Sequence, residues 1–347
     1  MVFITSSMSR LIFLAAIYGT LHGQTPPQDL TQLKLEDLMN IEVTSVSKKN
    51  RRCPGRPPPS LSSQRRTSGV RERTTFPTCC ALVPGVEVAQ INASEWAISV
   101  RGFNGQYSNK LLVLVDGRTV YSPMFSGVYW DAQDLLLADI ERIEVIRGPG
   151  ATVWGANAVN GVINIITKKA SDTQGGLLTT DAGNHEQGSG ALRYGGKLGS
   201  RATYRVFGKG FNRASFFAPD GTDGQDAWNM VHGGFRIDAN ASDQDTVILE
   251  GDAHSGNAGE IVSSIVSISP PVNSLLDLRN RYSGWNVLSR WNHAASPRSE
   301  TSLQIYFERD TRGDSTYAFG LNSFDIDFQP TSDGAPDRTW FGEWDTG

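Results

Sequence analysis

The sequence predicts a small α+β domain followed by part of an antiparallel transmembrane β-barrel. Three observations lead to this fold class: an apolar leader at the N-terminus, a glycine-rich middle with short β-branched runs, and segments of alternating hydrophobicity after residue 170. The 347 residues leave room for two domains, and the net charge of -4 argues against nucleic acid as a partner.

Residues 1–23 have the pattern of a secretory signal peptide. Arg10 precedes the apolar run Leu11–Ile17, and small residues follow between Gly19 and Gly23. This run is too short to span a bilayer as a helix, and no other stretch approaches the ~20 apolar residues that a spanning helix needs. A membrane protein with this sequence would therefore have to be a barrel, which satisfies its backbone hydrogen bonds between strands.

A β-hairpin is predicted near the middle of the chain. The apolar run Leu111–Val115 ends at Asp116-Gly117, and β-prone residues resume at Thr119–Tyr121. An Asp-Gly pair between two such runs is a strong hairpin signal, so the two strands should pair.

The glycines between residues 148 and 161 are interpreted as turn residues that end one strand and start the next, Val162–Thr167. A phosphate-binding loop would need Lys-Ser or Lys-Thr after its last glycine, but Ala156-Asn157 follow Gly155. A dinucleotide fingerprint would need a glycine at Val153. The sequence therefore predicts no cofactor.

Three segments together resemble the plug domain of TonB-dependent outer-membrane receptors. They are Ala97–Phe103, Leu111–Tyr121 and Ile140–Lys169, in the order and spacing of that family. Three ordered motifs over roughly 70 residues argue against chance similarity. The resemblance implies a plug domain over residues 82–170, a location in the cell outer membrane, and active transport of a scarce, bulky ligand, with a ferric siderophore as the default.

The resemblance also implies which residues form sites. Charged and turn residues that match the plug motifs are expected to form structural contacts within the plug or with the barrel: Arg101, Gly102, Asp116, Gly117, Glu141, Glu144, Arg147, Gly148, Gly155 and Asn164. Aromatic residues beside loops are candidates for ligand contact, because their rings combine apolar area with a polar edge: Tyr107, Tyr121, Phe125, Tyr129 and Trp130. Packing of the plug against the barrel is the alternative role for each ring.

Residues 24–49 are expected to be a periplasmic segment with one short strand. The β-prone residues are Ile41, Glu42, Val43, Thr44, Ser45, Val46 and Ser47, too few to fold alone. They resemble the TonB box, which adds as a strand to the partner TonB and its inner-membrane energising complex. Main-chain hydrogen bonds supply the affinity in such strand addition. An ordinary linker or a first plug strand is the alternative.

Residues 50–81 differ in composition from the rest, with seven arginines and all three cysteines of the chain. One interpretation is a disordered basic linker. The other is translation out of frame, because codons for Thr75–Ala81 can be chosen that in another frame encode a peptide typical of the family before Leu82–Gly85. The first helix and strand of the plug would then be missing. Adjacent Cys79 and Cys80 lack metal-site spacing, so no metal is predicted.

Residues 171–347 are expected to form the N-terminal part of the barrel, with about eight strands between Gly175 and Phe328. Residues 231–238, 246–254 and 302–308 alternate between apolar and polar side chains, with Ile248 as an exception. One face suits lipid and the other a wet lumen, although a soluble sandwich alternates in the same way. Plugged transporters have about 22 strands, so a fragment is expected.

Three functions remain in competition. The leading one is TonB-dependent transport, with TonB, outer-membrane lipid and a small-molecule ligand as partners. The alternatives are a soluble secreted β-rich binding or adhesion protein and a non-functional receptor fragment. An enzyme is not expected, because the five histidines lack metal spacing and no nucleophile or carboxylate pair stands out.

Overall fold

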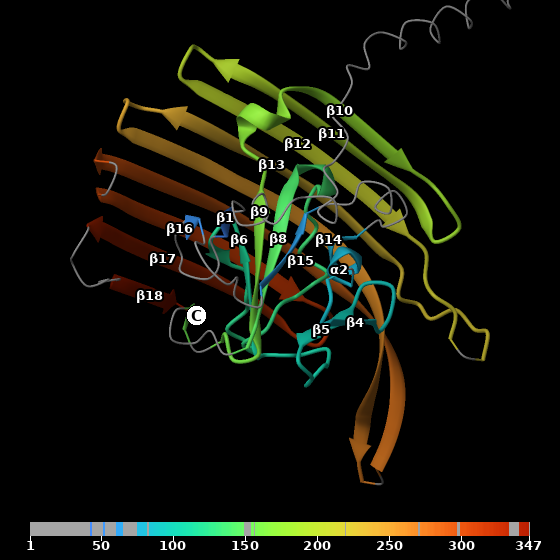
Figure 1. Cartoon of the computed structure of the whole chain (residues 1–347). Coiled ribbons are helices and arrows are strands. Elements are labelled where there is room, and N and C mark those ends of the chain that lie inside the picture. The colour runs from blue at the N-terminus through green and yellow to red at the C-terminus, as the bar shows by residue number, and fades with distance from the viewer. Residues whose placement is uncertain are drawn as a thin grey trace, which may run out of the picture.

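The computed structural model shows a small mixed domain on the concave face of a large curved sheet (Figure 1). It describes residues 42–43, 51–52, 60–64, 75–81, 83–148, 154–155, 157–218, 220–269, 271–296, 299–332 and 340–346. The predicted signal peptide, Cys53, Ile41 and Thr44–Ser47 lie outside the described residues. Glu42–Val43 (β1) pair with Arg51–Arg52 (β2).

The plug domain is built on a five-stranded sheet of order β3-β8-β9-β6-β7. Its strands are β3 (Ser60–Gln64), β6 (Leu111–Val115), β7 (Arg118–Thr119), β8 (Ile140–Arg147) and β9 (Gly161–Thr167). The central strands β6 and β9 run parallel and are buried along almost their whole length, as expected for strands covered on both faces. A separate hairpin joins β4 (Val86–Gln90) to β5 (Trp96–Val100).

Helix α2 (Phe76–Cys80) lies in the segment of unusual composition. Thr75 caps it by accepting a hydrogen bond from the amide of Thr78, and Phe76 stacks on Trp130 with ring centroids 6.2 Å apart. Cys79 and Cys80 are free thiols. The segment thus contributes α2 and β3 to the plug domain. Translation of this segment out of frame stays a hypothesis about the gene.

The predicted Asp-Gly hairpin is confirmed. Leu114 pairs with Thr119 and Val115 with Arg118, antiparallel. Asp116 and Gly117 both have positive φ, 49° and 89°, as a type I′ turn requires.

The described strands β10 to β18 form a nine-stranded antiparallel sheet in sequence order. They are β10 (Gly175–Asp181), β11 (Glu186–Leu198), β12 (Ala202–Arg213), β13 (Trp228–Asn240), β14 (Asp245–Ile268), β15 (Pro271–Ser296), β16 (Ser299–Gly313), β17 (Ala318–Ser332) and β18 (Trp340–Thr346). β10 to β17 correspond to the eight or so strands predicted before Phe328. β14 and β15 continue past the rest as a projecting hairpin (Figure 1).

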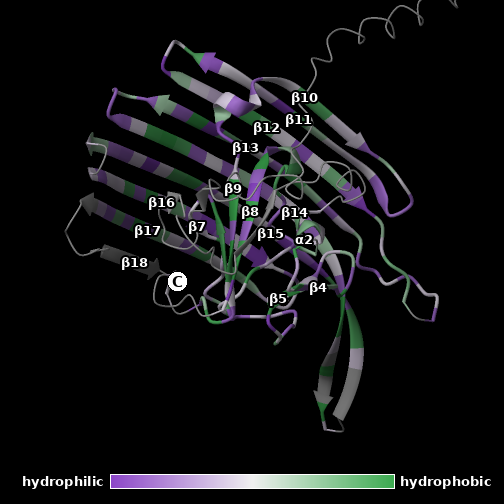
Figure 2. Cartoon of the chain, viewed as in Figure 1, coloured by the Kyte–Doolittle hydropathy of each residue, from purple (hydrophilic) through white to green (hydrophobic). Residues whose placement is uncertain are grey.

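The alternation predicted for this sheet is confirmed. His232 and Glu308 face inward and contact the plug domain, and Asp252 lies 3.2 Å from His232 on the same face. Val231 and Ile305 face outward and are exposed. Figure 2 shows hydrophobic and hydrophilic residues alternating along these strands. Such an apolar outer face beside a polar inner face is what a membrane barrel needs. In the described part of the chain, no helix is long and apolar enough to span a membrane.

The two edges of the curved sheet differ in their connections. Residues 199–201 and 241–244 make tight connections at one edge, where Ser296 also pairs with Ser299, and this edge is here called the turn edge. Residues 214–227, 314–317 and the projecting β14–β15 hairpin lie at the other, the loop edge. Outer-membrane barrels have short turns on the periplasmic side and longer loops outside, so the turn edge is the periplasmic one.

Candidate functional site

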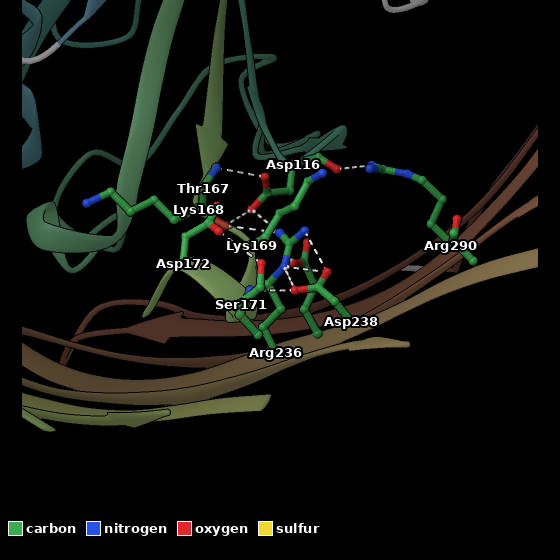
Figure 3. Close-up of polar contacts among 12 residues, drawn as sticks. Asp116, Thr167, Lys168, Lys169, Ser171, Asp172, Arg236, Asp238 and Arg290 are labelled. Carbon is green, nitrogen blue, oxygen red and sulfur yellow. Dashed lines mark hydrogen bonds and ion pairs between the residues drawn. The ribbon is translucent and has the colours of Figure 1, made fainter. Parts of the chain in front are cut away.

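The Asp116-Gly117 turn is tied to the end of β9 and to the curved sheet near the turn edge (Figure 3). The Asp116 carboxylate accepts hydrogen bonds from the Thr167 amide at 2.9 Å and from the Thr167 hydroxyl at 2.7 Å. Arg236 Nη1, on β13, lies 3.7 Å from the same carboxylate. One largely buried side chain therefore joins the hairpin, the last plug strand and the curved sheet.

The main chain of the same turn is held by two further strands. Arg290, on β15, donates to the Asp116 carbonyl, and Gln304, on β16, donates to the Gly117 carbonyl at 3.1 Å. Gln304 also accepts from Arg290 Nε at 2.9 Å, which positions the guanidinium. Both carbonyls of the turn are satisfied from the curved sheet, as buried polar groups require.

Replacing Gly117 by alanine is expected to destabilise the plug domain by about 2 kcal/mol. Positive φ disfavours any Cβ, and one added here would lie 2.8 Å from Arg290 Nη2 and 2.9 Å from Gln304 Oε1. Gly102→Ala is the matched control, because Gly102 also has positive φ (86°) but nothing lies within 4 Å of its added Cβ. Equal losses of unfolding free energy in the two variants would contradict the proposed contact.

Further ion pairs cross the interface between the plug domain and the curved sheet. They all involve plug residues between β7 and the start of β8: Arg118 with Glu308 (2.6 Å), Asp131 with Arg312 (2.7 Å), Asp134 with Lys209 (2.6 Å), and Asp139 with Arg193 and with Arg205 (3.6 Å). The side chains are largely buried. Removing one partner of such a pair leaves an uncompensated buried charge, so these contacts fix how the plug is seated.

The other predicted motif residues lie within the plug domain. Glu141 and Glu144 flank Arg142 at 2.6 and 2.8 Å. The Gly102 amide donates to Glu87 at 3.1 Å, and the Arg147 side chain packs against Gly85. The remaining positions are turn residues with positive φ or a buried strand residue: Arg101, Gly148, Gly155 and Asn164. Of the predicted motif residues, Asp116 and Gly117 make the contacts with Arg236, Arg290 and Gln304 of the curved sheet that are described above.

The sequence interpretation missed the plug partners of these ion pairs, Arg118, Asp131, Asp134 and Asp139. The sequence does contain a sign of these ion pairs. Charged residues lie between the apolar segments of the plug, and other charged residues lie on the inward faces of the predicted strands. The pairing itself was not visible, because each pair joins residues 54 to 190 positions apart.

Three of the five aromatic candidates gather near the loop edge. Phe125 meets Tyr107 and Tyr129 edge to face, at centroid distances of 5.3 and 4.8 Å. Tyr129 lies 6.5 Å from Phe319 of β17, and Arg312 lies 4.1 Å above its ring. Tyr107 is 60% exposed. These rings form an accessible surface between the plug and the curved sheet.

The other two aromatic candidates lie elsewhere. Trp130 is buried in the plug core, where its ring stacks on Phe76. Tyr121 lines a cavity of about 1180 Å³ between the plug sheet and the curved sheet, together with Asp116 and Arg290.

A polar group lies beside this aromatic surface. Glu95 accepts hydrogen bonds from Gln106 at 2.6 Å and from Asn92 at 2.7 Å. Burial, and then the carboxylates of Glu260 and Asp131, raise the pKa of Glu95 to about 7. Its charge therefore changes close to neutral pH.

The stability of the plug domain is expected to fall as the pH rises from about 4.3 to about 7, since Glu95 has an ordinary pKa of about 4.3 when unfolded. Between these values the folded state holds more protons than the unfolded state, so raising the pH favours unfolding. Thermal unfolding measured across this window should show the loss in the wild-type protein and a smaller loss in Glu95→Gln. The same slope in both proteins would contradict the assignment.

Comparison with known proteins agrees with this geometry. The TonB-dependent Receptor Plug Domain family matches residues 64–162. The vitamin B12 transporter BtuB of Vibrio vulnificus is 39% identical over 107 residues, which are 30% of this chain and 17% of that protein. BtuB of Vibrio cholerae is 30% identical over 132 residues, 38% of this chain and 21% of that protein.

Solved structures share the fold. A mutant of the ferric enterobactin receptor of Pseudomonas aeruginosa aligns with a TM-score of 0.61 and 17% identity, covering 84% of this chain and 49% of that one. The ferripyoverdine receptor of the same organism aligns with a TM-score of 0.60 and 13% identity, covering 83% and 42%. The chain thus spans less than half of these receptors, and its matches span under a quarter of the two transporters.

A plug domain seated on the inner wall of a membrane-facing antiparallel sheet defines the class of plugged outer-membrane barrels. The family match and the shared fold specify it further: residues 64–162 match the TonB-dependent Receptor Plug Domain, and the curved sheet has the fold of part of the barrel in the solved receptors. The resemblance expected from the sequence motifs is thus confirmed over the plug domain, and the ferripyoverdine receptor that shares the fold lies in the outer membrane.

Proposed function

We propose that the protein takes part in TonB-dependent active transport of a bulky ligand across the outer membrane. The observation that carries the proposal is the plug domain held on the inner wall by five sets of ion pairs. A plug seated in this way blocks a barrel lumen, so passage requires an external supply of energy to rearrange it. The non-functional receptor fragment is the competing outcome.

We also propose that three aromatic residues contact the ligand. Tyr107, Phe125 and Tyr129 lie near the loop edge, on the outer side, where an arriving ligand first meets the plug. Aromatic rings suit large ligands with flat apolar groups and polar edges. A corrinoid such as vitamin B12 and a ferric siderophore both have this character. Ferric siderophore remains the default ligand, with vitamin B12 as the alternative suggested by the relatives.

Energy coupling is assigned to the TonB-box-like segment, residues 41–47. Strand addition uses backbone donors, so Val43→Pro removes one donor and should abolish uptake, whereas Val43→Ala keeps it and should not. Uptake and surface binding of radiolabelled vitamin B12 and of ferric siderophores would be measured in cells with and without TonB. Binding without uptake in Val43→Pro supports the proposal. TonB-independent uptake, or neither binding nor uptake in the wild type, overturns it.

A further inference from the structure

Three arginines lie on the outward face of the curved sheet near the loop edge. Arg279 and Arg281 belong to β15 and Arg309 to β16, and all three are exposed. Their orientation follows from the strand alternation, because the intervening Asn280 and the flanking Tyr282 are buried on the inner side. The plug does not reach this face, so the arginines have no role in seating it.

The position of these arginines relative to the apolar band is specific. Trp285, 44% exposed, pairs directly with Arg309 in the register of β15 and β16. Toward the turn edge, Val287, Trp291 and Ile305 continue the exposed apolar surface. Aromatic residues mark the ends of the lipid-facing band of such barrels, so the arginines begin where the hydrocarbon region ends on the outer side.

The residues between the arginines have small or polar side chains. Ser283 and Thr311 pair across β15 and β16, and their hydroxyls are 2.8 Å apart. Gly313 lies opposite Arg281, and Arg309 donates weakly to Asn322 at 3.5 Å. Short side chains therefore lie between long cationic ones, which leaves room for an anionic group among the guanidinium groups.

The two ends of the apolar band carry different charge. At the loop edge, the three arginines share their face with Asp277, which leaves an excess of positive charge. At the turn edge, Asp245 accepts hydrogen bonds from Trp291 at 3.0 Å and pairs with His293 at 2.8 Å. In the described parts of β15 and β16, the exposed arginines thus lie at the loop edge.

We propose that Arg279, Arg281 and Arg309 bind the phosphate groups of an anionic lipid in the outer leaflet. Arginine presents a planar fork of donors that matches phosphate oxygens, and near a membrane surface each basic residue strengthens binding to anionic lipid. Close to the interface, an outward arginine costs far less free energy than at the bilayer midplane, and a phosphate contact offsets that cost. The site holds a lipid on the outer wall and is separate from ligand transport through the lumen.

The test is lipid binding by the protein purified from outer membranes in neutral detergent. Native mass spectrometry would follow the binding of diphosphorylated lipid A to the wild type, to each single Arg→Gln variant and to the triple variant. Each substitution is expected to weaken binding about fivefold, and the triple variant on the order of 100-fold. Arg201→Gln is the matched control, because Arg201 is exposed at the turn edge and should leave affinity unchanged.

Two comparisons separate the possible sources of phosphate. Dephosphorylated lipid A should bind the wild type as weakly as the triple variant binds the phosphorylated form, and inorganic phosphate should compete poorly. The triple Arg→Lys variant should retain part of the affinity, because it keeps the charge without the fork. Equal binding by wild type and a folded triple Gln variant, equal binding of dephosphorylated lipid A, or full competition by inorganic phosphate would each overturn the proposal.

Discussion

Replacing Arg312 by methionine is expected to destabilise the seated plug by about 3–5 kcal/mol. Arg312 donates to both carboxylate oxygens of Asp131, at 2.7 and 2.8 Å, and both side chains are buried. Its guanidinium also lies over the ring of Tyr129 at 4.1 Å. The variant would leave the Asp131 charge buried with its main partner gone, and the cation–π contact would be lost as well.

The unfolding free energy from chemical denaturation is the direct measurement for Arg312→Met. Asp131→Asn combined with Arg312→Met provides the matched control, because it removes the charge that the single variant leaves behind. A double-mutant cycle should give a large coupling energy, with the double variant losing less stability than the sum of the two single losses. Additive losses would show that the two side chains act independently and would contradict the proposed pair.

Replacing Asp116 by alanine is expected to lower the unfolding free energy by about 3 kcal/mol and to loosen the Asp116-Gly117 hairpin from β9. The carboxylate serves the amide and hydroxyl of Thr167 and faces Arg236. Arg236 keeps Asp238 and Glu250 as partners at 3.0 Å, so the loss falls chiefly on the hairpin and the end of β9. Hydrogen exchange at the Thr167 amide should increase together with the loss of stability.

Asp116→Asn is the informative companion variant. Asparagine tolerates the positive φ of 49° at this position, and its amide oxygen can still accept from Thr167. The charge toward Arg236 is lost, so a smaller destabilisation than in the alanine variant is expected. If alanine and asparagine leave exchange at Thr167 unchanged, the carboxylate does not hold the hairpin to β9.

The sequence predicts local structure wherever residues that are neighbours in the chain determine it. The Asp116-Gly117 pair predicts its own turn, because two consecutive positive φ angles favour these residues. Alternation along residues 302–308 predicts which side chains face inward, because a strand repeats every two residues. The three plug motifs likewise predicted the mixed domain, because each motif is a pattern of residues close together in the chain.

The partners of charged side chains were not readable from the sequence. Arg118 and Glu308 are 190 residues apart, and their contact depends on the depth and rotation of the plug against the curved sheet. Likewise, Trp130 and Tyr107 are both aromatic residues beside loops, yet one is buried and the other exposed. Composition and spacing predict that a ring is available, whereas packing decides what it contacts.

The sequence by itself determined the plug domain, the hairpin and the two-faced strands, because each depends on backbone preferences and periodicity over a few residues. Only the tertiary structure decided that Asp116 joins three elements, that Asp131 meets Arg312, and that outward arginines meet the end of an apolar band. The physical reason is that these contacts join residues distant in the chain, and their register is set by the pairing of whole strands.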